Sequence, residues 1–423
     1  MEIRASKGLQ GQITPASDKS ISHRSVMMGA IAKGVTLVDN FLMGEDCLST
    51  IDCFRKMGTE ISISGDQVKV RGNGLHGLKK PQELLYTGNS GTTTRLLCGL
   101  LAPQRFQSVL DGDASIRKRP MNRVIEPLIK MGAKISGING GYTPITIEGT
   151  QLHGIEYPLP VASAQLKSAL ILAGLYADGK TLITEPKPSR NHTELMINGF
   201  GGKVSTQENR ILVEPTEELY SCDLTVPGDI SSAAFFMVAA LIVPNSEILI
   251  KNVGLNETRT GILDVLQAMG GQIEVTMYGN TIEPAGDILV KSSSLHGTEI
   301  GGSLIPRLID ELPVLAVAAA FAEGTTMIKD AEELKVKESN RIEAMAAELT
   351  KAGVSVTTTE DGMIIRGGCP IHGAEFESYQ DHRIAMSMAV LALAAEGSSR
   401  IKDPQCIQIS YPGFFETLKS VQR

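Results

Sequence analysis

The sequence of 423 residues has no tryptophan and few other aromatic residues, with only 8 tyrosines and 10 phenylalanines. Little is therefore left for the aromatic platforms on which single-stranded nucleic acids stack. Neither sign of charge is in large excess, since 40 Lys and Arg stand against 47 Asp and Glu, a net charge of −7. A general surface for nucleic acid or anionic membrane is not expected. With so few aromatics, the core must be aliphatic.

Paired cysteines and long apolar runs are also missing. The six cysteines include no CxxC pair, and the histidines show no HExxH spacing, so we expect no metal and no cofactor. No apolar run approaches the roughly 18 residues that a membrane span requires. The first residues contain neither an apolar signal core nor an Arg/Ser-rich presequence. These absences predict a soluble, cytoplasmic protein with reduced cysteines.

Two glycine-rich segments resemble nucleotide-binding motifs only superficially. Gly72, Gly74 and Gly77 have GxGxxG spacing, but Pro81 stands where the required helix should run. The segment GNSGTTTR (88–95) lacks the Lys-Ser/Thr ending of a P-loop. Neither a dinucleotide site nor nucleotide hydrolysis is predicted.

A chain of this length is expected to form two or three domains, and it contains an internal repeat. Five of six short apolar segments are followed about twenty residues later by a glycine that is typical of a helix end. A helix rich in small apolar residues precedes each segment, and burial on every side is expected for it. The segments are TLVDN (36–40), SVLDG (108–112), TLITE (181–185), ILIKN (248–252), TMIKD (326–330) and SRIKD (399–403).

The chain thus reads as six copies of a unit of about 70 residues with two helices and several strands. The sixth copy, 379–423, is short, and we expect the N-terminal segment 2–13 to complete it. This would join both termini in one domain, residues 1–15 and 228–423, and leave residues 16–227 as the other. The chain would then cross between the domains near 14–17 and 226–229.

Polar and charged clusters recur at two equivalent places in each unit. One is the start of the apolar helix, and the other is the loop after the marker strand. Helix N-termini bind anions, and arginine pairs with carboxylates and phosphates through two hydrogen bonds. Each cluster alone has a plainer interpretation, as a helix cap or an ion pair. Their recurrence favours a site for small polyanions.

The clusters are DKSISHR, GNSGTTTR, RPM, SAQLKSA, SRNHTE, PGDISSA, DELPVLA, VKESNR and DHRIAM. Together they resemble the motifs of the 5-enolpyruvylshikimate-3-phosphate (EPSP) synthase family over about residues 10–415, in the form found in its second bacterial class. The resemblance implies a two-domain inside-out α/β barrel. It would contain six βαβαββ units, three per domain, and an interdomain active-site cleft.

The implied reaction transfers the enolpyruvyl group of phosphoenolpyruvate to the 5-hydroxyl of shikimate 3-phosphate and releases phosphate. The resemblance further implies a monomer, and a phosphoenolpyruvate site that the herbicide glyphosate occupies. For shikimate 3-phosphate, it assigns Lys19, Ser20, Arg24, Ser163, Gln165, Ser189, Arg190, Asp310 and Lys337. For phosphoenolpyruvate, it assigns Lys19, Asn89, Gly91, Thr92, Arg119, Gln165, Glu338, Arg341, His382 and Arg383.

Catalysis would need one group to protonate the methylene carbon and another to take the proton of the 5-hydroxyl. We expect Glu338 to serve the methylene and Asp310 the hydroxyl, and Lys19 is a second candidate acid. Two positions depart from the family pattern, because Glu333 replaces an asparagine and Ile409 stands near an expected lysine.

Two alternative functions compete with this one. The sister transferase that acts on UDP-N-acetylglucosamine shares the sixfold unit, but its catalytic loop carries a cysteine that is missing from DASIRKRPM (113–121). A non-catalytic sensor of anionic metabolites would gain nothing from the carboxylates of Asp310 and Glu338, which repel such ligands.

Overall fold

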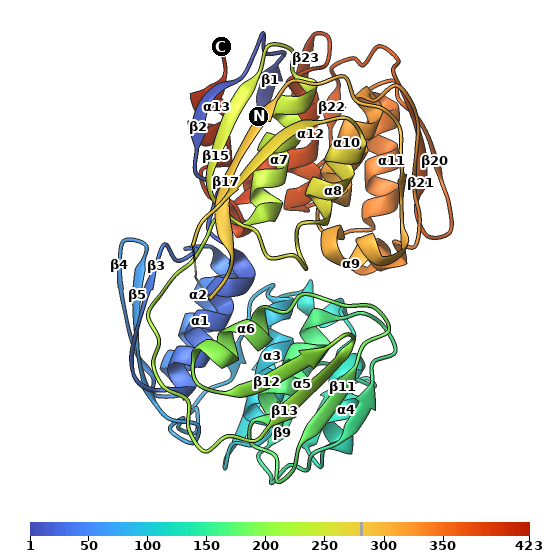
Figure 1. Ribbon diagram of the computed structural model, residues 1–423. Coiled ribbons are helices and arrows are strands. Elements are labelled where there is room, and N and C mark those ends of the chain that lie inside the picture. The colour runs from blue at the N-terminus through green and yellow to red at the C-terminus, as the bar shows by residue number, and fades with distance from the viewer. Residues whose placement is uncertain (280–281) are drawn as a thin grey trace. The chain divides into compact units, whose positions relative to one another are not determined.

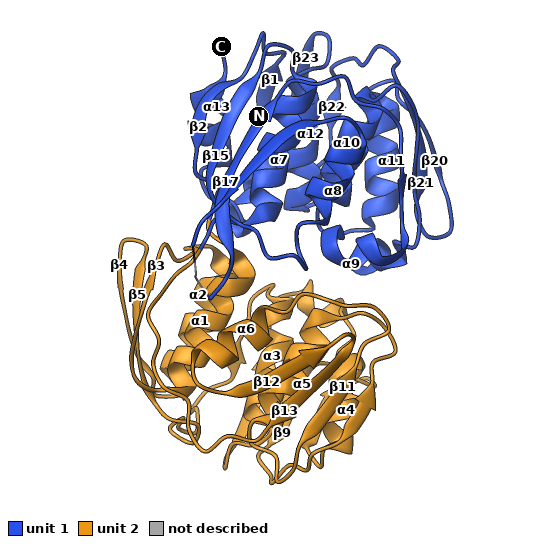
Figure 2. Cartoon of the chain, viewed as in Figure 1, with its two compact units in different colours: residues 1–16, 227–423 blue, residues 17–226 orange. Residues whose placement is uncertain are grey.

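The computed structural model describes residues 1–279 and 282–423. Contacts within the chain divide it into two compact units, coloured separately in Figure 2. Unit 1 comprises Met1–Ala16 and Pro227–Arg423, and unit 2 comprises Ser17–Val226. That each unit is a domain with the predicted boundaries stays a prediction. None of the helices in the described ranges is long and apolar enough to span a membrane.

Unit 2 contains three successive repeats and one closing strand (Figure 1). The first has α1 (Lys19–Ile31), β3 (Lys33–Asp39), α2 (Glu45–Lys56), β4 (Glu60–Ser64) and β5 (Gln67–Asn73). The second has β6 (Leu85–Tyr86), α3 (Gly91–Leu101), β7 (Gln107–Asp111), the 3₁₀ helix η1 (Ile116–Lys118), α4 (Asn122–Lys130), β8 (Lys134–Ile138) and β9 (Tyr142–Glu148). The third has β10 (Glu156–Pro158), α5 (Ala164–Gly174), β11 (Thr181–Thr184), α6 (His192–Gly199), β12 (Lys203–Gln207) and β13 (Arg210–Glu214), and β14 (Leu224–Thr225) follows.

Unit 1 begins with β1 (Glu2–Arg4) and β2 (Gln10–Ile13) and resumes after the second crossing. Its first repeat has α7 (Ile230–Ile242), β15 (Glu247–Gly254), α8 (Gly261–Ala268), β16 (Gln272–Met277) and β17 (Ala285–Lys291). The next has β18 (Glu299–Ile300), η2 (Gly302–Leu304), α9 (Ile305–Leu308), α10 (Leu312–Phe321), β19 (Gly324–Ile328), η3 (Glu332–Val336), α11 (Arg341–Lys351), β20 (Ser355–Thr358) and β21 (Met363–Gly367). The last has β22 (Glu375–Phe376), α12 (His382–Ala392), β23 (Ser398–Ile401), η4 (Pro404–Ile409) and α13 (Phe414–Val421).

The predicted repeat is confirmed strand by strand. All six marker segments form strands, and each belongs to a different sheet. Five sheets have four strands in one pattern, which the order β6-β7-β9-β8 illustrates. There, β6 runs parallel to the marker strand β7, while β9 pairs antiparallel with both β7 and β8. The fold is therefore α/β, built from repeated βαβαββ units.

The N-terminal segment does not complete the sixth repeat as a whole, which corrects the sequence-based expectation. Only β1 pairs with its marker strand β23, whereas β2 runs parallel to β15 in another sheet of unit 1. The exposed turn around Lys7 separates the two pairings. The sixth sheet consequently has three strands, in the order β1-β23-β22.

The apolar helices lie inside the units, and the sheets lie outside them (Figure 1). In unit 1, α7, α10 and α12 pack against one another, and every residue of α12 is buried. In unit 2, α3 packs against both α1 and α5. A helix without a polar face has no side that water can solvate, so it must be enclosed. This explains the inside-out arrangement of each unit.

The glycines predicted to end the second helix of each unit adopt the left-handed conformation. Their φ angles lie between +83° and +94°. A Cβ atom is sterically strained against the backbone at such angles, and glycine has no Cβ. They follow α2, α4, α6, α8 and α11, and they are Gly58, Gly132, Gly201, Gly270 and Gly353.

One helical glycine sets the distance between α3 and α5. A Cβ added at Gly99 would lie 2.0 Å from the backbone carbonyl oxygen of Ala169, which cannot rotate away. We expect Gly99→Ala to lower the free energy of unfolding of unit 2 by about 1–3 kcal/mol, the usual cost of overpacking. At Gly179, the nearest atom would be 3.9 Å away, so Gly179→Ala should change stability little. Urea unfolding of both variants tests this, and equal stability of the two would contradict it.

Candidate active site

The N-terminus of α1 carries the first group of predicted substrate contacts. Asp18 caps the helix by accepting a hydrogen bond from the Ile21 amide, so the plainer interpretation of this motif is also correct. Beside the cap, the Lys19 ammonium lies 3.2 Å from the Asp46 carboxylate and is partly exposed. Arg24 is buried on the next turn. The helix therefore presents one accessible and one buried cation near its positive end.

A second group gathers at the start of α3. The Arg119 guanidinium donates to the side-chain oxygen of Asn89 at 3.0 Å, which brings two predicted phosphoenolpyruvate contacts together. The Gln165 amide donates to the Thr92 hydroxyl at 3.1 Å and accepts from Arg95 at 2.6 Å. Sequence reasoning missed Arg95, although it is the last residue of the GNSGTTTR motif.

The other predicted contacts of unit 2 are less closely connected. Ser163 caps α5 through a hydrogen bond from the Leu166 amide, and Ser20 accepts from Arg24 through its backbone carbonyl. Ser189 is buried and Arg190 is half-buried, and both lie in the loop before α6.

In unit 1, one buried arginine organises the predicted catalytic carboxylates. Arg341, the first residue of α11, is 1% exposed. Its guanidinium lies 2.5 Å from Glu338, 2.9 Å from Asp381 and 3.4 Å from Asp310. These carboxylates raise the pKa of Arg341 above its ordinary value, although burial alone would lower it. Arg341 thereby holds Glu338 and Asp310 beside each other.

Two further predicted residues complete this cluster. Arg383 donates to the Asp310 backbone carbonyl at 2.9 Å, and Lys337 lies 3.9 Å from the Asp310 carboxylate. Burial lowers the pKa of Lys337, against the opposing effect of Asp310 and Glu333. His382 is buried as the first residue of α12. Sequence reasoning missed Asp381, whose carboxylate caps α12 and which precedes the predicted pair directly.

The two groups differ in charge balance. The unit 1 cluster combines three cations with three carboxylates, namely Lys337, Arg341 and Arg383 with Asp310, Glu338 and Asp381. The predicted contacts of unit 2 are cationic or neutral and include no carboxylate. The predicted contacts of unit 2 thus carry an excess of positive charge, whereas those of unit 1 include carboxylates that can exchange protons.

Comparison with known proteins decides the family. The sequence profile of EPSP synthase (3-phosphoshikimate 1-carboxyvinyltransferase) matches residues 3–418. The chain belongs to the EPSP synthase family. It is 56% identical over 419 residues to the 3-phosphoshikimate 1-carboxyvinyltransferase of Thermoanaerobacter sp. (strain X514), covering 99% of both chains. Identity to the Geobacter sulfurreducens enzyme of that name is 55% over 417 residues, covering 98% of this chain and 97% of that one.

Solved structures agree with this assignment. The EPSP synthase from Acinetobacter baumannii superposes with a TM-score of 0.90 at 45% identity, covering 99% of this chain and 97% of that one. The enolpyruvyl transferase NikO from Streptomyces tendae has a TM-score of 0.81 at 17% identity, covering 99% of this chain and 96% of that one, and shows the shared fold alone. The chain is therefore an enzyme, a 3-phosphoshikimate 1-carboxyvinyltransferase with the inside-out α/β fold.

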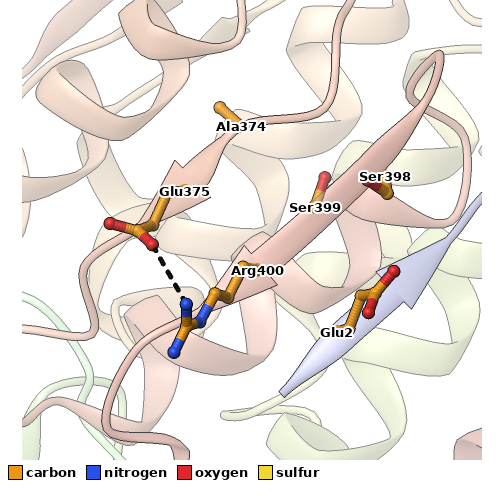
Figure 3. A pocket seen from close by; sticks show the side chains of 6 residues that line it. All are labelled: Glu2, Ala374, Glu375, Ser398, Ser399 and Arg400. Atoms are coloured by element: carbon orange, nitrogen blue, oxygen red, sulfur yellow. Dashed lines mark ion pairs between the residues drawn. The ribbon is translucent and has the colours of Figure 1, made fainter.

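A surface hollow in unit 1 is unrelated to these residues. It has a volume of about 470 Å³ and lies at the three-stranded sheet, where Arg400 pairs with Glu375 (Figure 3). None of its lining residues is a predicted substrate contact. The two departures from the family pattern lie elsewhere, Glu333 in η3 and Ile409 at the end of η4.

The Arg341–Asp381 pair should make the stability of unit 1 depend on pH. Burial would raise the pKa of Asp381, but the neighbouring guanidinium of Arg341 lowers it below its ordinary value. A lowered folded-state pKa gives stability that is present above about pH 4 and is lost as the pH falls through the folded value. We expect Asp381→Asn to lower the unfolding free energy by about 3–5 kcal/mol at pH 7.

The difference from the unmodified chain should shrink in acid, as unfolding curves between pH 7 and pH 3 would show. Asp178→Asn is the control, because Asp178 pairs with His153 on the surface and both side chains are more than half exposed. Its effect should stay below about 1 kcal/mol. A constant loss for Asp381→Asn at every pH would contradict the assigned ion pair.

Proposed function

We propose that the predicted residues of both units bind the two substrates of this transferase. For shikimate 3-phosphate, the guanidinium groups of Arg24 and Arg190 are the phosphate-compatible donors in unit 2. The Arg119–Asn89 pair and the N-terminus of α3 would bind phosphoenolpyruvate, because free backbone N–H groups there suit an anion. The remaining assignments follow the family resemblance, with Lys19 shared by both substrates.

Glu338 and Asp310 are the proposed proton carriers. Addition requires a proton on the methylene carbon of phosphoenolpyruvate while the 5-hydroxyl of shikimate 3-phosphate loses its proton and attacks C2. Elimination of phosphate from the resulting tetrahedral intermediate takes a proton back from the methyl group. The observation that supports these roles is the Arg341 contact with both carboxylates, since it keeps two proton acceptors adjacent and oriented. Lys19 would protonate or neutralise the departing phosphate.

Further parts of the proposal concern the setting of the enzyme. A monomer in the cytoplasm, without nucleic-acid or membrane partners, fits the resemblance and the charge balance. The UDP-N-acetylglucosamine transferase is disfavoured by DASIRKRPM, which carries no cysteine nucleophile. A non-catalytic sensor of anionic metabolites is disfavoured because the carboxylates of Asp310 and Glu338 would repel such ligands.

Phosphate release is the measurement that tests the function. It should occur with phosphoenolpyruvate plus shikimate 3-phosphate and not with the UDP-sugar. Glu338→Gln keeps the side-chain shape but removes the proton carrier, so turnover should fall about 100-fold or more. Calorimetric affinity for shikimate 3-phosphate should change far less. Lost substrate binding with intact turnover of bound complex would make Glu338 a binding residue only.

Gly91 provides a test of the phosphoenolpyruvate site. It does not have a positive φ, so alanine is not strained by the backbone there. An added Cβ would lie 3.1 Å from Nη1 of Arg95 and 3.4 Å from Nη1 of Arg119, both ends of flexible side chains. The methyl group would therefore narrow the space beside these guanidinium groups without unfolding α3.

We expect Gly91→Ala to raise the inhibition constant of glyphosate, the bulkier ligand, at least tenfold more than the KM for phosphoenolpyruvate. The Tm should change by less than a few degrees. Steady-state kinetics with both ligands measures the ratio. Equal weakening of both, or a large fall in Tm, would refute the placement of Gly91 beside the inhibitor.

A further inference from the structure

A buried charge cluster in unit 2 has no part in the steps above. Lys167 of α5 belongs to the SAQLKSA motif, yet its side chain is 2% exposed. Its ammonium lies 2.9 Å from the Glu185 carboxylate and 2.8 Å from that of Glu194, which are also buried. Lysine and glutamate are rarely buried so fully unless they are paired, so the cluster demands a reason.

The cluster holds Ser189 from both sides of its backbone. Lys167 Nζ donates to the Ser189 carbonyl oxygen at 3.1 Å, and the Ser189 amide donates to Glu185 Oε2 at 3.3 Å. The Ser189 hydroxyl donates to Glu185 Oε1. Ser189 precedes Arg190, so these bonds fix the loop that presents both residues.

A second branch of the network connects Arg24 to α5 and to α6, the helix that follows the same loop. Its guanidinium donates to the Thr193 hydroxyl at 2.7 Å and to the Ser168 hydroxyl at 2.9 Å. Ser168 follows Lys167 in α5, and Thr193 precedes Glu194 in α6. Two adjacent positions of α5 therefore contact two adjacent positions of α6.

Within the two branches, the positive charges of Lys167 and Arg24 equal in number the negative charges of Glu185 and Glu194. Removing the lysine charge would leave Glu185 facing Glu194 in a buried environment. Such carboxylates move apart or take up protons, and either change releases the bonds to Ser189.

We infer that Lys167, acting with Glu185, is a positioning residue for shikimate 3-phosphate, because together they fix the Ser189–Arg190 loop in its binding conformation. This inference rests on the proposed function, which places Ser189 and Arg190 on that substrate. Lys167 acts through Ser189 and does not touch the substrate. Loss of Lys167 should therefore weaken the binding of shikimate 3-phosphate and leave the rate of the catalytic steps unchanged.

The decisive comparison uses two variants that differ only at position 167. Glu194→Gln serves as the reference, and Lys167→Met combined with Glu194→Gln is the test variant. Removing one cation and one carboxylate together keeps the buried charges balanced, which protects folding. From reference to test variant, we expect the KM for shikimate 3-phosphate to rise about tenfold, as for loss of a charge-assisted hydrogen bond. kcat and the KM for phosphoenolpyruvate should stay within about twofold.

The same comparison in an Arg190→Ala background separates positioning from a structural role. If Lys167 acts by holding the Ser189 backbone and thereby the loop that presents Arg190, its removal should raise the KM for shikimate 3-phosphate less than threefold there. An equal rise in both backgrounds would overturn the inference. An equal rise in the KM of both substrates, or a fall in Tm with unchanged KM, would overturn it too.

A buried network in unit 1 supplies the control for stability alone. Glu348 is fully buried and pairs with Lys351 and the Tyr379 hydroxyl, and none of the three is a proposed substrate contact. Glu348→Gln should lower the Tm without changing the KM for shikimate 3-phosphate. Absence of phosphate release by the unmodified enzyme would instead overturn the proposed function, because no KM would then exist to compare.

Discussion

The enclosure of helices without a polar face governs the structure of each unit. Such helices offer water nothing to solvate along their sides, so the sheets must lie outside them. Only their ends can then carry polar chemistry, and the N-terminal end has unpaired amides and a positive dipole. In α1, α3, α5, α7 and α12, a capping side chain occupies that end. Several of the proposed site residues follow such a cap within two turns, among them Arg24 in α1, Gln165 in α5 and Arg383 in α12.

This constraint also explains why some of the proposed functional charges, such as those of Arg24 and Arg341, are buried. A cation that pairs with the capping carboxylate of an enclosed helix, as Arg341 does with Asp381 at α12, is surrounded by protein, and its desolvation must be offset by partners. Arg341 is offset by three carboxylates, and Arg259 by Asp229 at 2.9 Å at the equivalent place after β15. Removing one charged side chain from such a network leaves its partner buried and unpaired, which costs several kcal/mol. The side chains of the network are therefore held in fixed orientations. Orientation is what proton transfer and phosphate binding both require.

The sequence predicted the parts of the fold that depend on local chemistry. The marker strands, the apolar helices and the left-handed glycines such as Gly58 and Gly353 all follow from periodicity and from the absence of a Cβ. The pairing of β2 did not, because a four-residue strand with one buried side chain, that of Ile13, has no feature that selects one sheet over another. Motif resemblance supplied the residues of the candidate site. It did not reveal Lys167, Glu185 or Asp381, whose importance lies in burial and mutual contact.

The split of the N-terminal segment shows how a repeated fold is closed. β2 runs parallel to β15 in the first repeat of unit 1, while β1 pairs with β23 in the last, so residues 2–13 tie these two sheets together. In unit 2, the late strand β14 returns to β3, the first marker strand, and pairs with it in the first sheet of that unit. In each unit, a short strand just before a crossing of the chain thus pairs with the marker strand of the first repeat. A single repeat cannot bury its apolar helix alone. The pairing of these short strands therefore completes the layer of sheets around the three apolar helices of each unit.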